Sequence, residues 1–231
     1  MADSAGIGLL PEGLPWRSAA LRVDFVSDVT CPWCAIGLQG LEQAIARVGR
    51  PVELHLQPFE LNPDMPPQGE PVAAYAARKY GASAEQMAAR QRLIRQRGAE
   101  AGLALAERTH VYNTFDAHRL LHWASLQGRG LDLKRALLAA YHERGENPAS
   151  PEVLVRAAAV AGLDTVAAAA LLDSDAHVQT VRDTVRQWQR RGIDSVPSVV
   201  IDGQHLIQGA RSVEDFERAL RKVAEAAQPV G

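Results

Sequence analysis

The sequence predicts an α/β fold in which a large, all-helical segment interrupts a small domain built around a sheet. Strand-like apolar runs occupy the early part of the chain, and strand character returns after Gly192. Between about residues 71 and 191 the composition is dominated by Ala, Leu, Arg, Gln and Glu. These are strong helix formers, so the middle of the chain is predicted to be helical.

The chain begins with a β-α-β pattern. Residues 1–20 contain several Gly and Pro and are interpreted as a loose arm, and residues 21–26 form a first apolar strand. A helix is predicted from residue 31 to about residue 48, where a glycine and a proline follow. Residues 52–59 alternate apolar and polar, which indicates a second strand. This order predicts parallel pairing through a right-handed crossover.

Helix starts and a hairpin complete the pattern. In the helical segment, Asn113-Thr114 and Ser150, which precedes a proline, are typical helix starts. After Gly192, residues 196–201 and 205–207 are predicted strands, joined by an Asp-Gly turn. A last helix is expected from residue 212 to about residue 227.

Three parts follow from this order. They are an N-terminal arm at residues 1–20, a discontinuous domain at residues 21–62 and 192–227, and an inserted helical domain at residues 63–191. Without the insertion, the order of strands and helices is that of a thioredoxin-like fold. The insertion lies between its second and third core strands.

Composition excludes several function classes. The 231 residues carry a net charge of −2 and are 47% hydrophobic, with no membrane-length apolar run and no basic patch. We therefore expect no nucleic-acid or membrane partner. The first residues lack the cationic and apolar regions of a secretory signal. A cytoplasmic protein is the expectation.

The only two cysteines form a C-x-x-C motif, Cys31-Pro32-Trp33-Cys34, directly after a predicted strand and at a predicted helix start. Free backbone N–H groups and the helix dipole at such a start favour a thiolate. A C-x-x-C pair beside a β-α-β pattern predicts a thioredoxin-like redox dithiol.

These residues resemble a known family. The C-P-W-C motif within residues 27–34, the helical insertion, and residues 192–198 before the hairpin resemble DsbA-like thiol–disulfide oxidoreductases. Residues 113–120 are similar to the cytoplasmic FrnE-like branch. The resemblance extends from residue 21 to about residue 227.

The resemblance implies roles for individual residues. Cys31 would be the exposed nucleophile and Cys34 the buried resolving thiol. Pro197 would be a cis-proline facing the disulfide, and the Val196 backbone would pair with an extended substrate. No cofactor beyond the redox-active disulfide is required.

The residues between the cysteines, Pro32 and Trp33, are expected to tune the redox potential. The periplasmic oxidants of the family carry histidine where this chain has Trp33, which has no charge to stabilise the thiolate. We therefore expect a less oxidising dithiol than in that branch.

A buried acid six residues before the first cysteine is common in thioredoxin-like proteins, and here that position is Phe25. Alternation places the neighbouring Asp24 on the other face of the strand. Asp28, three residues before Cys31, is a candidate site residue. A loop aspartate that only caps backbone N–H groups is an equally good interpretation.

Asn113, Thr114 and His118 are candidates for a substrate or glutathione groove, with a helix cap and amphipathic packing as the alternative. A metal site is not expected, because two thiolates need two further ligands. His118 and His122 have a suitable helical spacing, but such pairs are more often packing or surface residues.

A second function class shares this layout. Kappa-class glutathione transferases and hydroxychromene-carboxylate isomerases bind glutathione at the same helix start and usually carry serine where Cys31 stands. Glutathione is therefore a candidate co-substrate, with Ser212 or Asp215 near its γ-glutamyl end. Expected partners are thiol- or disulfide-containing proteins or small molecules, and both a monomer and a homodimer fit the sequence.

Overall fold

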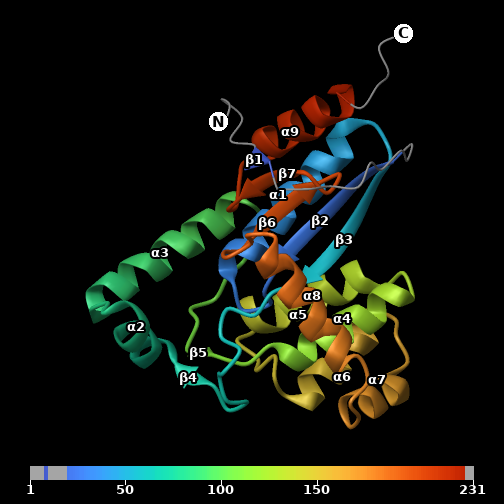
Figure 1. Cartoon of the computed structure of the whole chain (residues 1–231). Helices are drawn as coiled ribbons and strands as arrows, with labels where there is room; N and C mark the ends of the chain where they lie inside the picture. The colour runs from blue at the N-terminus through green and yellow to red at the C-terminus, as the bar shows by residue number, and fades with distance from the viewer. Residues whose placement is uncertain (1–7, 10–19, 227–231) are drawn as a thin grey trace. The chain divides into compact units, whose positions relative to one another are not determined.

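The structure is a computed structural model that describes residues 8–9 and 20–226. It divides into two compact units (Figure 1). The first unit contains residues up to 27, residues 33–59 and the chain from residue 184 onward. The second contains residues 28–32 and 60–183. The last boundary between the units falls inside helix α8 (Val178–Arg190). The short segment 28–32, which ends at the first residue of helix α1 (Pro32–Val48), groups with the insertion.

The first unit is built on a mixed five-stranded sheet with the order β1-β7-β6-β2-β3. Strands β2 and β3 pair in parallel from Leu21 opposite Val52, as predicted, and the other pairs are antiparallel. Val, Ile and Phe dominate the buried strand positions, and these are residue types that favour strands. The strands are β1 (Gly8–Leu9), β2 (Leu21–Ser27), β3 (Val52–Pro58), β6 (Ser198–Ile201) and β7 (His205–Gln208).

The predicted Asp-Gly hairpin is confirmed. Asp202 and Gly203 both have positive φ, 48° and 69°, as the turn between β6 and β7 requires. The Asp202 carboxylate also accepts a 2.9 Å hydrogen bond from the backbone N–H of Arg22 in β2. The hairpin is thereby fixed to the central strand of the sheet.

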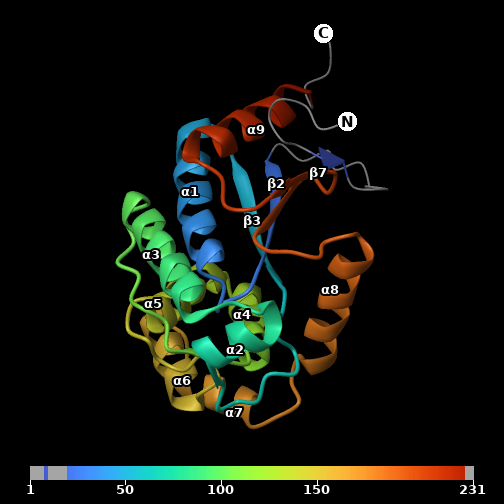
Figure 2. The same cartoon turned by 90° about the vertical axis from the view of Figure 1, so that its left-hand side faces the viewer.

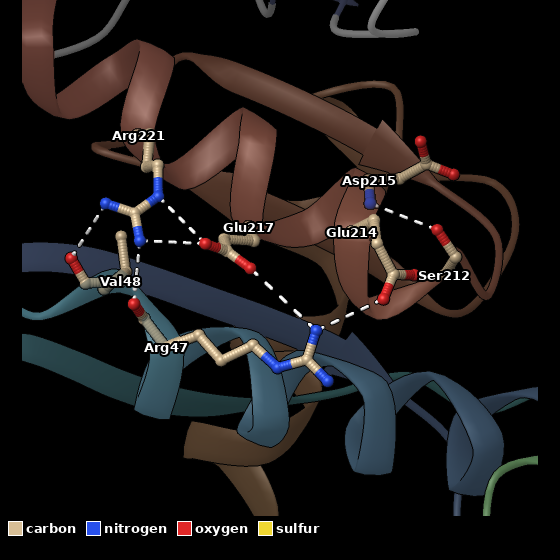
Figure 3. A network of polar contacts seen from close by, with 7 residues as sticks. All are labelled: Arg47, Val48, Ser212, Glu214, Asp215, Glu217 and Arg221. Atoms are coloured by element: carbon tan, nitrogen blue, oxygen red, sulfur yellow. Dashed lines mark hydrogen bonds and ion pairs between the residues drawn. The ribbon is translucent and has the colours of Figure 1, made fainter.

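Helices α1 (Pro32–Val48) and α9 (Val213–Ala226) lie side by side in the first unit. A Cβ on Gly40 would come within 3.7 Å of the Phe216 ring, so the two helices approach closely. At their far ends, the Arg221 guanidinium donates a 2.8 Å hydrogen bond to the backbone carbonyl of Arg47 (Figure 3). The Arg47 side chain in turn pairs with Glu214 at 3.2 Å.

The second unit is mainly helical. Helices α4 to α7 pack against one another in chain order, and α4 also contacts α7 (Figure 2). Their shared core includes Ala117, Leu120, Leu133, Leu137, Leu154 and Ala168, all fully buried. The helices that lie wholly in this unit are α2 (Val72–Tyr80), α3 (Ala84–Glu100), α4 (Phe115–Leu126), α5 (Gly130–His142), α6 (Pro151–Val160) and α7 (Thr165–Leu172).

Two short strand pairs correct the predicted elements. Gly8–Leu9 forms β1 at the edge of the sheet, within the predicted loose arm. Inside the predicted all-helical insertion, β4 (Glu70–Pro71) pairs with β5 (His110–Val111). Strands of two residues are too short to show a period of two, so no sequence pattern reveals them. The predicted order of a sheet domain interrupted by a mainly helical insertion is otherwise confirmed.

Within residues 8–9 and 20–226, no helix is both long and apolar enough to cross a membrane.

Candidate active site

The dithiol stands where the first unit's leading helix begins. Cys31 immediately precedes Pro32, the first residue of α1, and Cys34 lies in the first turn. Proline suits this first position because its missing N–H would have no partner there. The structure records both cysteines as thiols rather than as a disulfide. The predicted placement of the C-x-x-C motif at a helix N-terminus is therefore confirmed.

The expected exposure of Cys31 is wrong. Its relative exposure is 4%, against 0% for Cys34. All residues from 27 to 32 are buried. The small Cys31 side chain therefore exposes little of its surface to solvent. Cys31 is nevertheless the more exposed of the two cysteines, as expected.

The loop before Cys31 is organised by the carboxylate of Asp28, which is 1% exposed. One oxygen accepts hydrogen bonds from the backbone N–H of Thr30 at 3.0 Å and from its hydroxyl at 3.3 Å. The other accepts the backbone N–H of Leu61 at 2.7 Å. The Asp28 carbonyl accepts the backbone N–H of Cys31 at 3.3 Å. These contacts fit a loop-capping aspartate, and a part in proton transfer stays a prediction.

His142, at the end of α5, holds the same loop. Its Nε2 lies 2.9 Å from the carbonyl oxygen of Val29, and the side chain is 2% exposed. Because a carbonyl can only accept, Nε2 carries the proton and donates it. Burial, with the nearby Arg108 charge, lowers the pKa of His142 to about 3. The ring is therefore neutral. Sequence reasoning missed this contact, since no pattern links residues 113 positions apart.

In the first unit, the Val196–Pro197 peptide bond is cis. The Pro197 ring lies next to α1, because a Cβ on Gly37 would be 3.1 Å from its Cγ. Gly37 is one helical turn beyond Cys34, so Pro197 packs against the part of α1 that follows the second cysteine. The Pro197 carbonyl accepts a 2.8 Å hydrogen bond from Gly209.

The position of the missing acid is filled by Phe25, which is fully buried in the sheet. Asp24 is also buried, at 2% exposure, but it is bound to Arg22 at 2.8 Å and to Gln57 at 2.6 Å. The carboxylate therefore belongs to a separate polar cluster of β2 and β3.

Three predicted groove residues lie at the start of α4. The Asn113 side chain accepts the Phe115 N–H at 2.8 Å and donates to the Pro63 carbonyl at 3.2 Å. Thr114 is buried and its hydroxyl does not cap the helix. His118 is 2% exposed. Asn113 is thus the side chain that caps this helix, and it also borders a hollow described below.

Ser212 and Asp215 belong to the start of α9. The Ser212 hydroxyl accepts the Asp215 N–H at 3.1 Å, which is an N-cap contact. The Asp215 carboxylate pairs with Arg218 one turn along the helix. These two residues and Cys34 lie in the first unit, whereas Cys31 and Asn113 lie in the second.

A hollow of about 350 Å³ lies in the second unit, and its lining residue Glu60 directly precedes Leu61, whose N–H binds the Asp28 carboxylate. Burial and the nearby Asp28 and Asp64 charges raise the pKa of Glu60 to about 7, and Arg182 opposes this shift. Neither Glu60 nor Arg182 belongs to a sequence motif, so no pattern selects them. The hollow is lined by Glu60, Pro63, Pro67, Asn113, Phe115, Asp116 and Arg182.

No group of three or more His, Cys, Asp or Glu side chains in residues 8–9 and 20–226 could hold a metal ion. His122 lies with its ring 4.8 Å from that of His177 rather than forming a cluster with the cysteines.

Comparison with known proteins gives the family. The DSBA-like thioredoxin domain matches residues 22–221 of this chain. The chain belongs to this family. The more specific FrnE-like assignment stays a prediction.

Solved structures of this DsbA-like fold are similar over most of the chain. The probable DsbA oxidoreductase SCO1869 from Streptomyces coelicolor is 33% identical, with a TM-score of 0.83, covering 91% of this chain and 93% of that one. The cytosolic disulfide reductase DsbM from Pseudomonas aeruginosa, solved with GSH, is 18% identical (TM-score 0.59; 88% and 99% covered). A 2-hydroxychromene-2-carboxylate isomerase is 16% identical (TM-score 0.67; 89% and 97% covered). The last two likenesses show the fold alone.

Proposed function

We propose that this DsbA-like protein is a thiol–disulfide oxidoreductase, with Cys31 as the nucleophile and Cys34 as the resolving thiol. The observation that carries the proposal is the C-P-W-C motif at the N-terminus of α1, within a DSBA-like thioredoxin domain. Backbone N–H groups at this helix end stabilise a thiolate on the first cysteine.

In the reducing direction, the Cys31 thiolate attacks a substrate disulfide. A bond forms between Cys31 and one substrate sulfur, and the other sulfur leaves as a thiolate that takes up a proton. The Cys34 thiolate then attacks the Cys31 sulfur of the mixed disulfide. The Cys31–Cys34 disulfide forms and the second substrate thiol leaves. The protein dithiol loses two electrons and two protons, and the substrate disulfide gains both. The oxidising direction is the reverse.

The substrate proposed is a thiol- or disulfide-containing protein or small molecule. A cytoplasmic location and glutathione as co-substrate form part of the proposal. They are supported by the sequence expectation and by the likeness to DsbM, which is described as a cytosolic disulfide reductase and was solved with GSH. Val196, beside the cis-proline, is proposed to offer its backbone to an extended substrate.

Catalysed reduction of insulin, with glutathione as the electron donor, tests the proposal. The Cys31→Ser variant should lose the catalysed rate, and Cys34→Ser should accumulate mixed disulfides. Asp164→Asn, at the exposed cap of α7, is a control that should keep the wild-type rate. Wild-type turnover by Cys31→Ser would refute the mechanism. A glutathione-dependent isomerisation that survives in that variant would favour the isomerase class instead.

A further inference from the structure

The hollow near the Asp28 loop is lined by two opposite charges, Glu60 and Arg182, that can still bind a ligand. Across the described part of the chain, the Glu60 carboxylate accepts no hydrogen bond, and the Arg182 guanidinium forms no ion pair within 4 Å. Arg182 lies over the Phe115 ring, 5.2 Å from its centroid. The third charge, Asp116, is bound to the buried Arg119 at 2.8 Å. Glu60 and Arg182 are therefore the two groups available to a ligand.

Opposite charges select the class of ligand. Glu60 would repel a purely anionic ligand, and Arg182 would repel a purely cationic one. A zwitterion satisfies both, with an ammonium donating to the carboxylate and a carboxylate accepting from the guanidinium fork. The volume of about 350 Å³ is at the small end for ligand sites, which fits a group of amino-acid size.

The hollow is linked to the loop of Cys31 through Asp28, which uses both its carboxylate and its carbonyl. Glu60 precedes Leu61, whose N–H donates to Asp28 at 2.7 Å, and the Asp28 carbonyl accepts from the Cys31 N–H at 3.3 Å. We propose that the hollow is a subsite for the α-amino acid end of a thiol or disulfide substrate, with Glu60 binding its ammonium and Arg182 its carboxylate. This inference rests on the proposed function and narrows its substrate class to cysteine-like compounds.

The same site predicts a pH dependence. The charged groups that act on Glu60 are Asp28, Asp64 and Arg182, and the pKa of Glu60 is raised to about 7. Only the ionised carboxylate pairs with an ammonium. Affinity for the zwitterion should therefore rise as the pH increases through about 7, until the ligand ammonium itself loses its proton.

Binding of S-methylcysteine, which cannot exchange disulfides, tests the subsite by calorimetry without any turnover. N-acetyl-S-methylcysteine lacks the ammonium, and S-methylcysteine amide lacks the carboxylate. Each should bind wild type about tenfold more weakly than the parent. Glu60→Gln should remove the discrimination against the acetylated ligand, and Arg182→Gln that against the amide.

The controls are Glu152→Gln on α6 and Arg190→Gln on α8, two exposed residues outside the hollow that should bind like wild type. No binding of S-methylcysteine, or equal effects of the hollow and control variants, would overturn the subsite.

Turnover separates this inference from the proposed function. Cystine should be reduced with a higher kcat/KM than the neutral 2-hydroxyethyl disulfide, and Glu60→Gln should abolish the preference. Reduction of both disulfides at the same kcat/KM would overturn the subsite alone. Selective binding of S-methylcysteine without reduction of either disulfide would support the subsite and refute the redox function.

Discussion

The carbonyl oxygen of Val29 accepts a hydrogen bond from a buried, neutral histidine of α5. Two side chains thus hold the loop that carries Cys31. Asp28 fixes it to Leu61 through the backbone, and His142 fixes it to a helix of the insertion. The conformation of the loop before Cys31 therefore depends on residues remote from it in the sequence.

His142→Phe keeps a ring of similar size but leaves the Val29 carbonyl without a donor. We expect a loss of about 1–3 kcal/mol in the free energy of unfolding, measured in urea, and slower disulfide exchange. His142→Gln retains an N–H donor and should recover part of both. A His142→Phe variant that exchanges at the wild-type rate would show that this contact does not position Cys31.

The same substitution has a pH signature. The folded pKa of His142 is about 3, below its unfolded value, so its stabilising effect is present above about pH 6.5 and is lost as the pH falls. The stability advantage of wild type over His142→Phe should shrink by about 2 kcal/mol between about pH 7 and about pH 5. Glu60 acts in the opposite direction, because its folded pKa is raised. It is unchanged in both proteins, so its effect cancels in the comparison.

Trp33 stands between the two cysteines and brings no charge. Replacing it with histidine supplies a side chain that can stabilise the Cys31 thiolate, which favours the reduced dithiol. The redox potential of Trp33→His, from glutathione titration, should rise by about 30 mV for each 1.4 kcal/mol of added thiolate stabilisation. Trp33→Phe is the uncharged control. An unchanged potential in Trp33→His would contradict the expectation that this position keeps the dithiol weakly oxidising.

At the scale of elements, the last helix supports the one that carries the dithiol. Arg221 of α9 donates to the Arg47 carbonyl at 2.8 Å and to the Val48 carbonyl at 3.5 Å, the last residues of α1. These carbonyls have no partner within their own helix. The Arg47–Glu214 ion pair nearby is exposed and adds little.

Arg221→Gln should therefore lower the free energy of unfolding by about 1 kcal/mol, measured by urea denaturation. Arg218→Gln, one turn earlier on α9, removes only a contact within the same helix and should cost less. Equal losses in the two variants would indicate that Arg221 does not cap α1.

The sequence was sufficient to predict elements that have a clear local pattern. The parallel β2–β3 pair, the Asp202-Gly203 hairpin and the Ser150 cap of α6 all follow from local spacing and turn chemistry. The sequence could not predict β1, β4 and β5, because a strand of only two residues is determined by the neighbouring backbone with which it pairs. The choice of Asn113 over Thr114 as the cap of α4 likewise depends on side-chain direction.

The candidate site was predictable to a similar degree. Cys31, Cys34 and Pro197 stand out by spacing and resemblance, and the structure places the cysteines at a helix start and gives Pro197 a cis bond. His142 and Glu60 could not be found, because their meaning depends on burial and on contacts with the loop at residues 28–31.

At the scale of the whole molecule, the dithiol motif spans both compact units. Residues 28–32 group with the helical insertion, and residues 33–59 group with the sheet. The second unit thus contains both the loop that ends at Cys31 and the hollow proposed to bind part of the substrate.

The most direct test of the central claim is to trap the intermediate on Cys31. The Cys34→Ser variant is mixed with 2-hydroxyethyl disulfide, and its intact mass is measured before and after dithiothreitol. One adduct that maps to Cys31 and disappears on reduction is the predicted result, with a much slower reaction for Cys31→Ser. Absence of an adduct on Cys34→Ser, or equally fast modification of Cys31→Ser, would contradict the assignment of Cys31 as the nucleophile.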